Sequence, residues 1–82
     1  MSTLKDLREQ ALLSPNEVAK LCGIDRQTVY NWEGGYRRPS PEYQRRLVEI
    51  YHCTPEELLA ALRETKMQYE RRKQLENEQP AA

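Results

Sequence analysis

The chain has 82 residues, with 13 basic side chains, 13 acidic side chains and one histidine, so its formal net charge is zero. This length suits one small domain and leaves too few residues to enclose an enzyme pocket. No run approaches the roughly 18 apolar residues of a membrane span, and the N-terminal stretch lacks the apolar segment of a signal peptide. We therefore expect a cytoplasmic protein that is not an enzyme and has no membrane association.

The zero net charge conceals an uneven distribution. Residues 14–46 hold six basic and four acidic side chains, a balance of +2, and residues 47–63 hold one basic and three acidic side chains, a balance of −2. A basic segment favours a nucleic-acid partner, although an excess this small does not decide the question.

Few side chains could bind a metal ion or form a disulfide, since the sequence has two cysteines and one histidine. Cys22 and Cys53 form no Cys-x-x-Cys motif, so we interpret both as small buried apolar side chains, with a disulfide or a metal site as the alternatives. His52 stands between two expected helices and is interpreted as a turn residue, because nothing nearby completes a metal site. We expect no metal, no other cofactor and no catalytic residues.

The first expected helix begins after a Thr3 cap and runs to about Leu12. Its apolar stripe recurs at i, i+3 and i+7 and consists of Leu4, Leu7 and Ala11. Its charged side chains are expected to face water, namely Lys5, Asp6, Arg8 and Glu9.

Residues 14–33 predict a helix-turn-helix motif, in which two short helices are joined by a tight turn. Ser14 and Glu17 match a capping box at the start of the first helix. Gly23 can adopt the left-handed conformation that ends this helix, and Asp25 can cap the second one. The two helices are expected over about 15–22 and 26–33.

The helix over 26–33 has two distinct faces at roughly 100° per residue. Its inward side is expected to hold Thr28, Val29 and Trp32. Its outward side contains no acid and no lysine and consists of Arg26, Gln27, Tyr30 and Asn31. Arg offers two donors to guanine, Gln and Asn offer a donor–acceptor pair to adenine, and Tyr offers a ring or a hydroxyl. We predict that this face reads DNA bases, with a plain solvated face as the alternative.

The segment that follows is expected to contact DNA phosphates. Gly34 and Gly35 permit a left-handed exit from the helix, and the loop after them carries an aromatic residue and two adjacent arginines. A fourth helix is expected from Ser40-Pro41 to about Tyr51. Solubilising charge is the alternative role of the loop arginines. The expected phosphate-contacting residues are Ser14, Asn16, Tyr36, Arg37, Arg38, Arg45 and Arg46.

A fifth helix is expected from a capping box at Thr54 through Leu62. Beyond it, heptad spacing gives a poor coiled-coil seam, which is Thr65, Tyr69, Arg72 and Glu76. We expect residues 1–63 to form a helix-turn-helix DNA-binding domain. Residues 64–82 are expected to form a charged helical extension that frays before Pro80 or binds a partner.

No segment alternates polar and apolar residues as a strand would. The predicted fold class is therefore all-α, a compact bundle of about five helices with a helix-turn-helix and a charged C-terminal helical extension.

Several short runs stand at a specific spacing, and they are Leu13-Ser14, Glu17-Val18-Ala19, Gly23-Ile24, Thr28-Val29, Trp32-Glu33, Gly35, Pro39-Ser40, Leu47 and Thr54 to Leu58. With these runs, a little over half of the chain resembles the phage-repressor family of helix-turn-helix proteins, the Cro and lambda-repressor-like group. The resemblance implies a bundle of about five helices. It also implies that Arg26, Gln27, Tyr30 and Asn31 enter the major groove, and that the loop after helix three and the start of helix four contact the DNA backbone.

The chain departs from this family at Pro15, where the family often carries a glutamine that contacts phosphate. Asn16 is the expected substitute. The run from Arg26 to Glu33 also resembles the MerR and excisionase group. Those proteins follow the helix pair with a two-stranded wing, for which residues 34–63 offer no alternating pattern.

These features lead us to expect a sequence-specific transcriptional regulator that binds double-stranded DNA, a repressor that acts as a homodimer on a palindromic operator. The alternative is an antitoxin-like or adaptor protein whose main partner is another protein, bound through residues 63–82. Co-purification of such a partner through that segment would distinguish the two.

Overall fold

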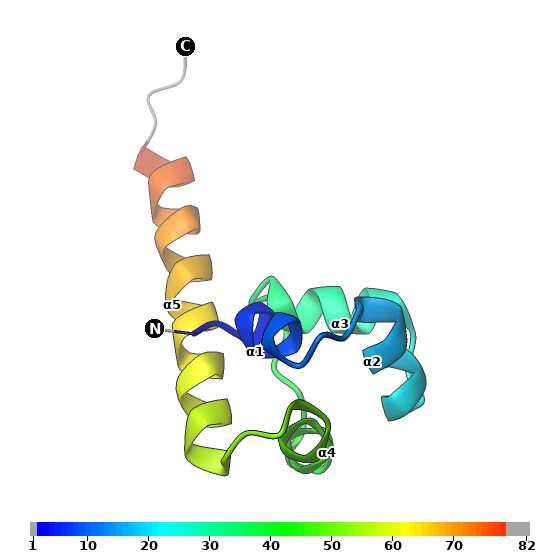
Figure 1. Cartoon of the computed structure of the whole chain (residues 1–82). Helices are drawn as coiled ribbons and strands as arrows, with labels where there is room; N and C mark the ends of the chain where they lie inside the picture. The colour runs from blue at the N-terminus through cyan, green and yellow to red at the C-terminus, as the bar shows by residue number, and fades with distance from the viewer. Residues whose placement is uncertain (1, 79–82) are drawn as a thin grey trace.

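The computed structural model describes residues 2–78, which fold into five α-helices (Figure 1). The helices are α1 (Leu4–Gln10), α2 (Pro15–Cys22), α3 (Arg26–Glu33), α4 (Pro41–Tyr51) and α5 (Pro55–Glu78). None of residues 2–78 lies in a strand, so the predicted all-α class is confirmed and no two-stranded wing follows α3 within this range.

Side-chain caps begin four of the five helices. Thr3, Ser14, Asp25 and Thr54 each accept a hydrogen bond from the main-chain N–H three residues ahead, as their sequence contexts predict. Ser40 does not, although it occupies the N-cap position of α4. The start of α4 instead depends on a proline at the first helical position, where no N–H is needed.

The core fills the space among all five helices. Its buried apolar residues are Leu4, Leu7, Val18, Ala19, Cys22, Val29, Trp32, Leu47, Tyr51, Leu58, Ala61 and Leu62. The Trp32 ring is 4% exposed and its centroid lies 5.4 Å from that of Tyr43, so its predicted core position is confirmed. Both cysteines are free, and burial raises the pKa of the Cys22 thiol, which suits an inert core residue.

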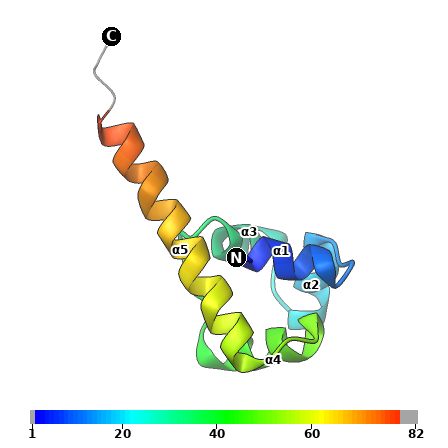
Figure 2. The same cartoon turned by 60° about the vertical axis from the view of Figure 1, so that its left-hand side comes forward.

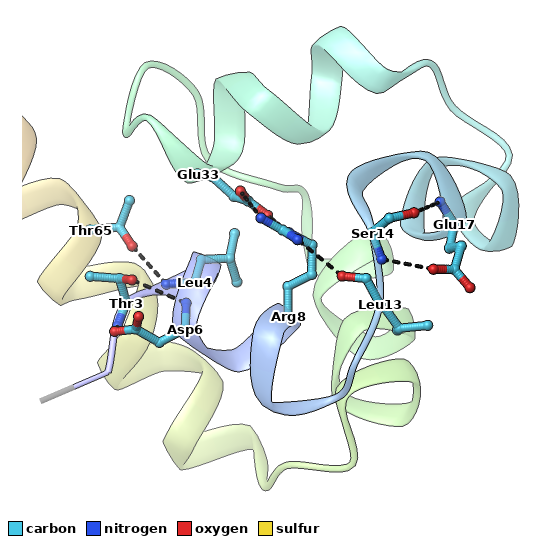
Figure 3. Close-up of polar contacts among 9 residues, drawn as sticks. All are labelled: Thr3, Leu4, Asp6, Arg8, Leu13, Ser14, Glu17, Glu33 and Thr65. Carbon is cyan, nitrogen blue, oxygen red and sulfur yellow. Dashed lines mark hydrogen bonds and ion pairs between the residues drawn. The ribbon is translucent and has the colours of Figure 1, made fainter.

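Arg8 does not face water, and that expectation is wrong. Its Nε and Nη2 donate to the Glu33 carboxylate at 2.6 and 3.2 Å, and its Nη1 donates to the Leu13 carbonyl at 3.0 Å (Figure 3). The two charged side chains are only 9% and 7% exposed. The spacing of residues along α1 does not show that Arg8 has an ion-pair partner in α3. For this reason the sequence pattern alone places Arg8 on the solvent side.

The structure defines the turns that follow α1, α3 and α4 in more detail than the sequence predicts. α1 ends at Gln10, and Leu12 adopts a left-handed φ of 59° with its side chain 89% exposed. After α3 only Gly35 is left-handed, with φ 81°, whereas Gly34 has φ −80°. His52 closes α4 with φ 53°, which confirms its predicted turn position.

α5 is one unbroken helix of 24 residues, so the expected boundary between residues 63 and 64 falls inside it. Both views show its C-terminal half projecting beyond the other helices (Figures 1 and 2). Neither α5 nor another helix within the described range is long and apolar enough to cross a membrane. The expected fraying before Pro80 concerns residues beyond Glu78, which lie outside the described part of the chain.

Candidate nucleic-acid interface

The turn between α2 and α3 is fixed by main-chain hydrogen bonds. The Gly23 N–H donates to the Lys20 carbonyl at 3.3 Å, and the Ile24 N–H donates to the Ala19 carbonyl at 3.0 Å. Gly23 has φ 68°, and no atom lies within 4 Å of where a Cβ would stand. Glycine is therefore needed here for its left-handed backbone and not for space.

α3 is held at its start, its middle and its end. At the start, Asp25 Oδ1 accepts from the Thr28 N–H at 2.8 Å and from the Thr28 hydroxyl at 2.7 Å, and these bonds lower the pKa of the Asp25 carboxyl. In the middle, Val29 and Trp32 are buried in the core. At the end, Glu33 binds the Arg8 guanidinium. These anchors leave one face of α3 exposed.

That face carries the four predicted base-reading residues. Arg26, Gln27 and Tyr30 are exposed and Asn31 is half-buried. Gln27 Nε2 donates to Asn31 Oδ1 at 3.2 Å, and the Arg26 guanidinium lies 5.9 Å from the centroid of the Tyr30 ring. The amide pair uses one donor and one acceptor, so both amides keep capacity for further hydrogen bonds. We call the surface formed by Arg26, Gln27, Tyr30 and Asn31 the outer face of α3.

The loop after α3 is clamped between α3 and α5. The N–H groups of Tyr36 and Arg37 both donate to the Asn31 carbonyl, at 3.0 and 3.2 Å. From the other side, Arg72 Nη2 donates to the Gly34 carbonyl at 2.9 Å. The Tyr36 ring meets the Tyr69 ring edge-on, with centroids 5.2 Å apart. The loop arginines are therefore presented from a fixed backbone.

Gly35 is required by this clamp. A Cβ at Gly35 would stand 2.6 Å from the Tyr69 Cβ and 3.1 Å from the Thr65 carbonyl oxygen. The backbone of the loop thus approaches α5 more closely than any side chain would permit, and the φ of 81° is itself left-handed.

The predicted phosphate-contacting residues are all exposed, but they do not form one cluster. Ser14 and Asn16 stand at the start of α2, and Tyr36, Arg37 and Arg38 follow α3. The two arginines of α4 are adjacent, and Arg45 lines a hollow shared with α5.

Sequence reasoning missed the contacts that α5 makes beyond Leu62. The Thr65 hydroxyl is buried and accepts from the Leu4 N–H at 2.9 Å (Figure 3). Tyr69 and Arg72 contact the loop after α3. Thr65, Tyr69 and Arg72 occupy the heptad positions that make a poor coiled-coil seam, and α5 contacts the rest of the domain along these positions. Their heptad spacing was the one sequence signal that could have predicted these contacts.

No group of three or more His, Cys, Asp or Glu side chains in the described range is placed to hold a metal ion.

Two short helices joined by a glycine turn, with the second anchored inward and polar outward, define a helix-turn-helix protein. A family model described as a helix-turn-helix domain matches residues 2–65, and the chain belongs to this family. Membership agrees with the resemblance to the Cro and lambda-repressor-like group.

The chain is similar to the HTH-type transcriptional regulator AnsR of Bacillus subtilis (strain 168). The two are 37% identical over 59 residues, which is 72% of this chain and 51% of AnsR. The chain therefore spans about half the length of this relative. No solved structure gave a significant match.

Proposed function

We propose that the protein is a sequence-specific DNA-binding transcriptional regulator that places α3 in the major groove. The outer face of α3 carries this proposal. It presents a guanidinium, two amides and a phenol on a helix whose opposite side is locked into the core. Those groups match the donor and acceptor patterns of base edges. Similarity to AnsR, a transcriptional regulator by its name, supports the same function.

Phosphate contacts would fix the register of α3 on the duplex. The loop arginines, Arg37 and Arg38, are the strongest candidates, because the clamp between α3 and α5 holds their backbone. The Ser14 hydroxyl accepts the Glu17 N–H and keeps its own hydrogen for a phosphate oxygen. The remaining proposed phosphate contacts are Asn16, Tyr36, Arg45 and Arg46.

The regulator would act as a homodimer and repress transcription by occupying its operator. Two-fold symmetry implies a palindromic site whose half-sites lie about 34–36 Å apart, one turn of the duplex. In this proposal residues 1–63 carry base reading, and residues 64–82 extend the domain.

Selection on random duplex DNA with the purified chain tests the proposal. A symmetric enriched motif would support both base reading and dimeric binding. A single, asymmetric half-site would support base reading and overturn the dimer. Absence of any enriched sequence would overturn DNA reading and favour an adaptor that binds a protein through residues 63–82.

Two matched variants separate the roles of α3 and the loop. Arg26→Ala should weaken binding by about 1–3 kcal/mol and relax discrimination at one base pair. Arg37→Ala should weaken binding to all sequences alike, because phosphates carry no sequence information. Binding of every operator variant by Arg26→Ala with unchanged preference would show that Arg26 reads no base.

A further inference from the structure

We propose that one flank of α5 binds DNA phosphates outside the region covered by α3, which makes α5 part of the DNA interface. This inference rests on the proposed function. The surface combines loop and helix residues, and we call it the basic flank: Arg37, Arg38, Arg63, Lys66 and Lys73.

The loop and the helix contribute to the same two hollows. Lys66 lines a hollow of about 150 Å³ together with Arg37 and Arg38. Lys66 and Arg38 also line a second hollow of about 280 Å³, which Arg63 joins. Lys73 lines a third hollow, and each of the second and third hollows has one acidic residue in its lining, Glu70 and Glu76 respectively. Cations from two segments distant in sequence are therefore gathered on one side of α5.

Among the described side chains, those of residues 2–76, none of these cations forms an ion pair, and the one ion pair joins Arg8 and Glu33. Lys66 and Lys73 lie over the Tyr69 ring instead, with their Nζ atoms 4.9 and 5.9 Å from its centroid. An aromatic ring positions an ammonium group without cancelling its charge. The basic flank thus combines five cations, two of which are positioned over an aromatic ring, and such a surface suits a polyanion.

The position of the basic flank suits a duplex bound by α3. In both views α3 lies along the edge of the bundle opposite α4, and α5 projects past that same edge (Figures 1 and 2). The side chains of Val29 and Trp32 point from α3 into the core, so its outer face points away from the core at this edge. A duplex seated there would run past α5, in which Lys66 lies beside the loop after α3 and Lys73 stands in the projecting C-terminal half.

Charge removal on the two sides of α5 tests the inference. The variants are Lys66→Gln, Lys73→Gln and their combination, measured as full-length chains on the duplex found by selection. The matched control is Arg71→Gln, which removes one charge from the same helix about 160° away from Lys73. The measured quantity is the magnitude of the negative slope of log K against log salt concentration, and this magnitude falls by about 0.9 for each lost phosphate contact on B-DNA.

For each bound protomer, we expect a lysine variant to lower this magnitude by about 0.9 and the double variant by about 1.8, which doubles for a homodimer, and we expect Arg71→Gln to leave it unchanged. Base preference should not change, and Lys73→Arg should restore the slope because it keeps the charge. Equal thermal midpoints would show that the fold is intact, and Lys73→Gln serves alone if Lys66→Gln unfolds.

Two results would overturn the inference while leaving the proposed function intact. One is a double variant that binds the duplex with the wild-type slope. The other is an Arg71→Gln variant that loses as much slope as the lysine variants. Failure of the wild-type chain to bind any duplex would overturn the proposed function itself, and the inference with it.

Discussion

The guanidinium of Arg8 and the carboxylate of Glu33 form a two-point ion pair between α1 and the end of α3 (Figure 3). The same guanidinium also donates to the Leu13 carbonyl in the turn that leads into α2. The pairing raises the pKa of the Arg8 guanidinium above its ordinary value. One side chain therefore ties together α1, the turn before α2 and the end of α3, and so helps to hold α3 in place.

Removing one partner of this pair should cost more than removing both. Arg8→Met leaves a buried carboxylate and a carbonyl without donors, so we expect a loss of about 3–5 kcal/mol in the free energy of unfolding. The double variant Arg8→Met/Glu33→Met should recover much of that loss. Urea titration measures both. Lys5→Met, on the exposed side of α1, should stay within about 0.5 kcal/mol of wild type, and Arg8→Met matching it would contradict the prediction.

Loss of the Thr65 hydroxyl should lower the free energy of unfolding, although the group is small. Thr65→Val keeps the shape but leaves the buried Leu4 N–H without an acceptor, at a cost of about 1–3 kcal/mol. Thr65→Ser keeps the hydroxyl and is the matched control, since it loses only a methyl group. Urea titration gives the stabilities. Exchange of the Leu4 amide hydrogen should accelerate in Thr65→Val, and equal exchange in both variants would disprove the role of this bond.

The two left-handed glycines should respond differently to alanine. Gly23→Ala meets no neighbouring atom, so its cost is backbone strain alone, about 1–2 kcal/mol. Gly35→Ala adds a clash with the Tyr69 Cβ, so it should cost more and should loosen α5 from the loop. Thermal unfolding gives the ranking, and hydrogen exchange along α5 shows the loosening. A Gly35→Ala chain as stable as Gly23→Ala would mean that α5 moves aside freely.

Acid should destabilise the chain through its caps. Hydrogen bonds from Thr3, Ser14 and Thr28 lower the pKa values of Asp6, Glu17 and Asp25 below their ordinary values of 3.8, 4.5 and 3.8. Because the folded values are the lower ones, the unfolded chain binds more protons in acid. The stabilisation is complete at neutral pH and is lost as the pH falls from the ordinary values through the folded ones.

Asp25→Asn isolates one of these groups. Asparagine can still accept the Thr28 N–H but does not titrate, so stability at pH 7 should change little. Between pH 7 and about pH 3 the variant should lose less thermal stability than wild type. Thermal midpoints at the two pH values measure this, and equal losses in both proteins would show that the Asp25 cap plays no part.

The starts of these helices could be predicted from the sequence because the two residues of each capping box lie close together in it. Ser14 and Glu17 bind each other across three positions, and so do Thr54 and Glu57. Arg8 and Thr65 were not predictable in the same way, since their partners lie 25 and 61 positions away. A local pattern records which side chains suit a cap or a face, but not which distant group completes a contact.

The outer face of α3 followed from helical periodicity, because Val29 and Trp32 mark its inner side clearly. The contacts of α5 with the loop after α3 did not, because they are made by a phenol and a guanidinium. Tyr69 packs on another tyrosine and Arg72 donates to a main-chain carbonyl, and neither appears in an apolar pattern. Polar seams of this kind are invisible to a count of apolar residues.

The loop after α3 is held by main-chain atoms of α3 and not by the side chains of its outer face. Gly34, Tyr36 and Arg37 reach α3 through the carbonyls of Tyr30 and Asn31, which every amino acid supplies. Among the described side chains, those of residues 2–76, the side-chain hydrogen bonds and cation–π contacts of the outer face run only among its own four members. Under the proposed function, exchanging those side chains would alter which bases are read without disturbing where the loop arginines stand, so a new operator preference would need no new scaffold.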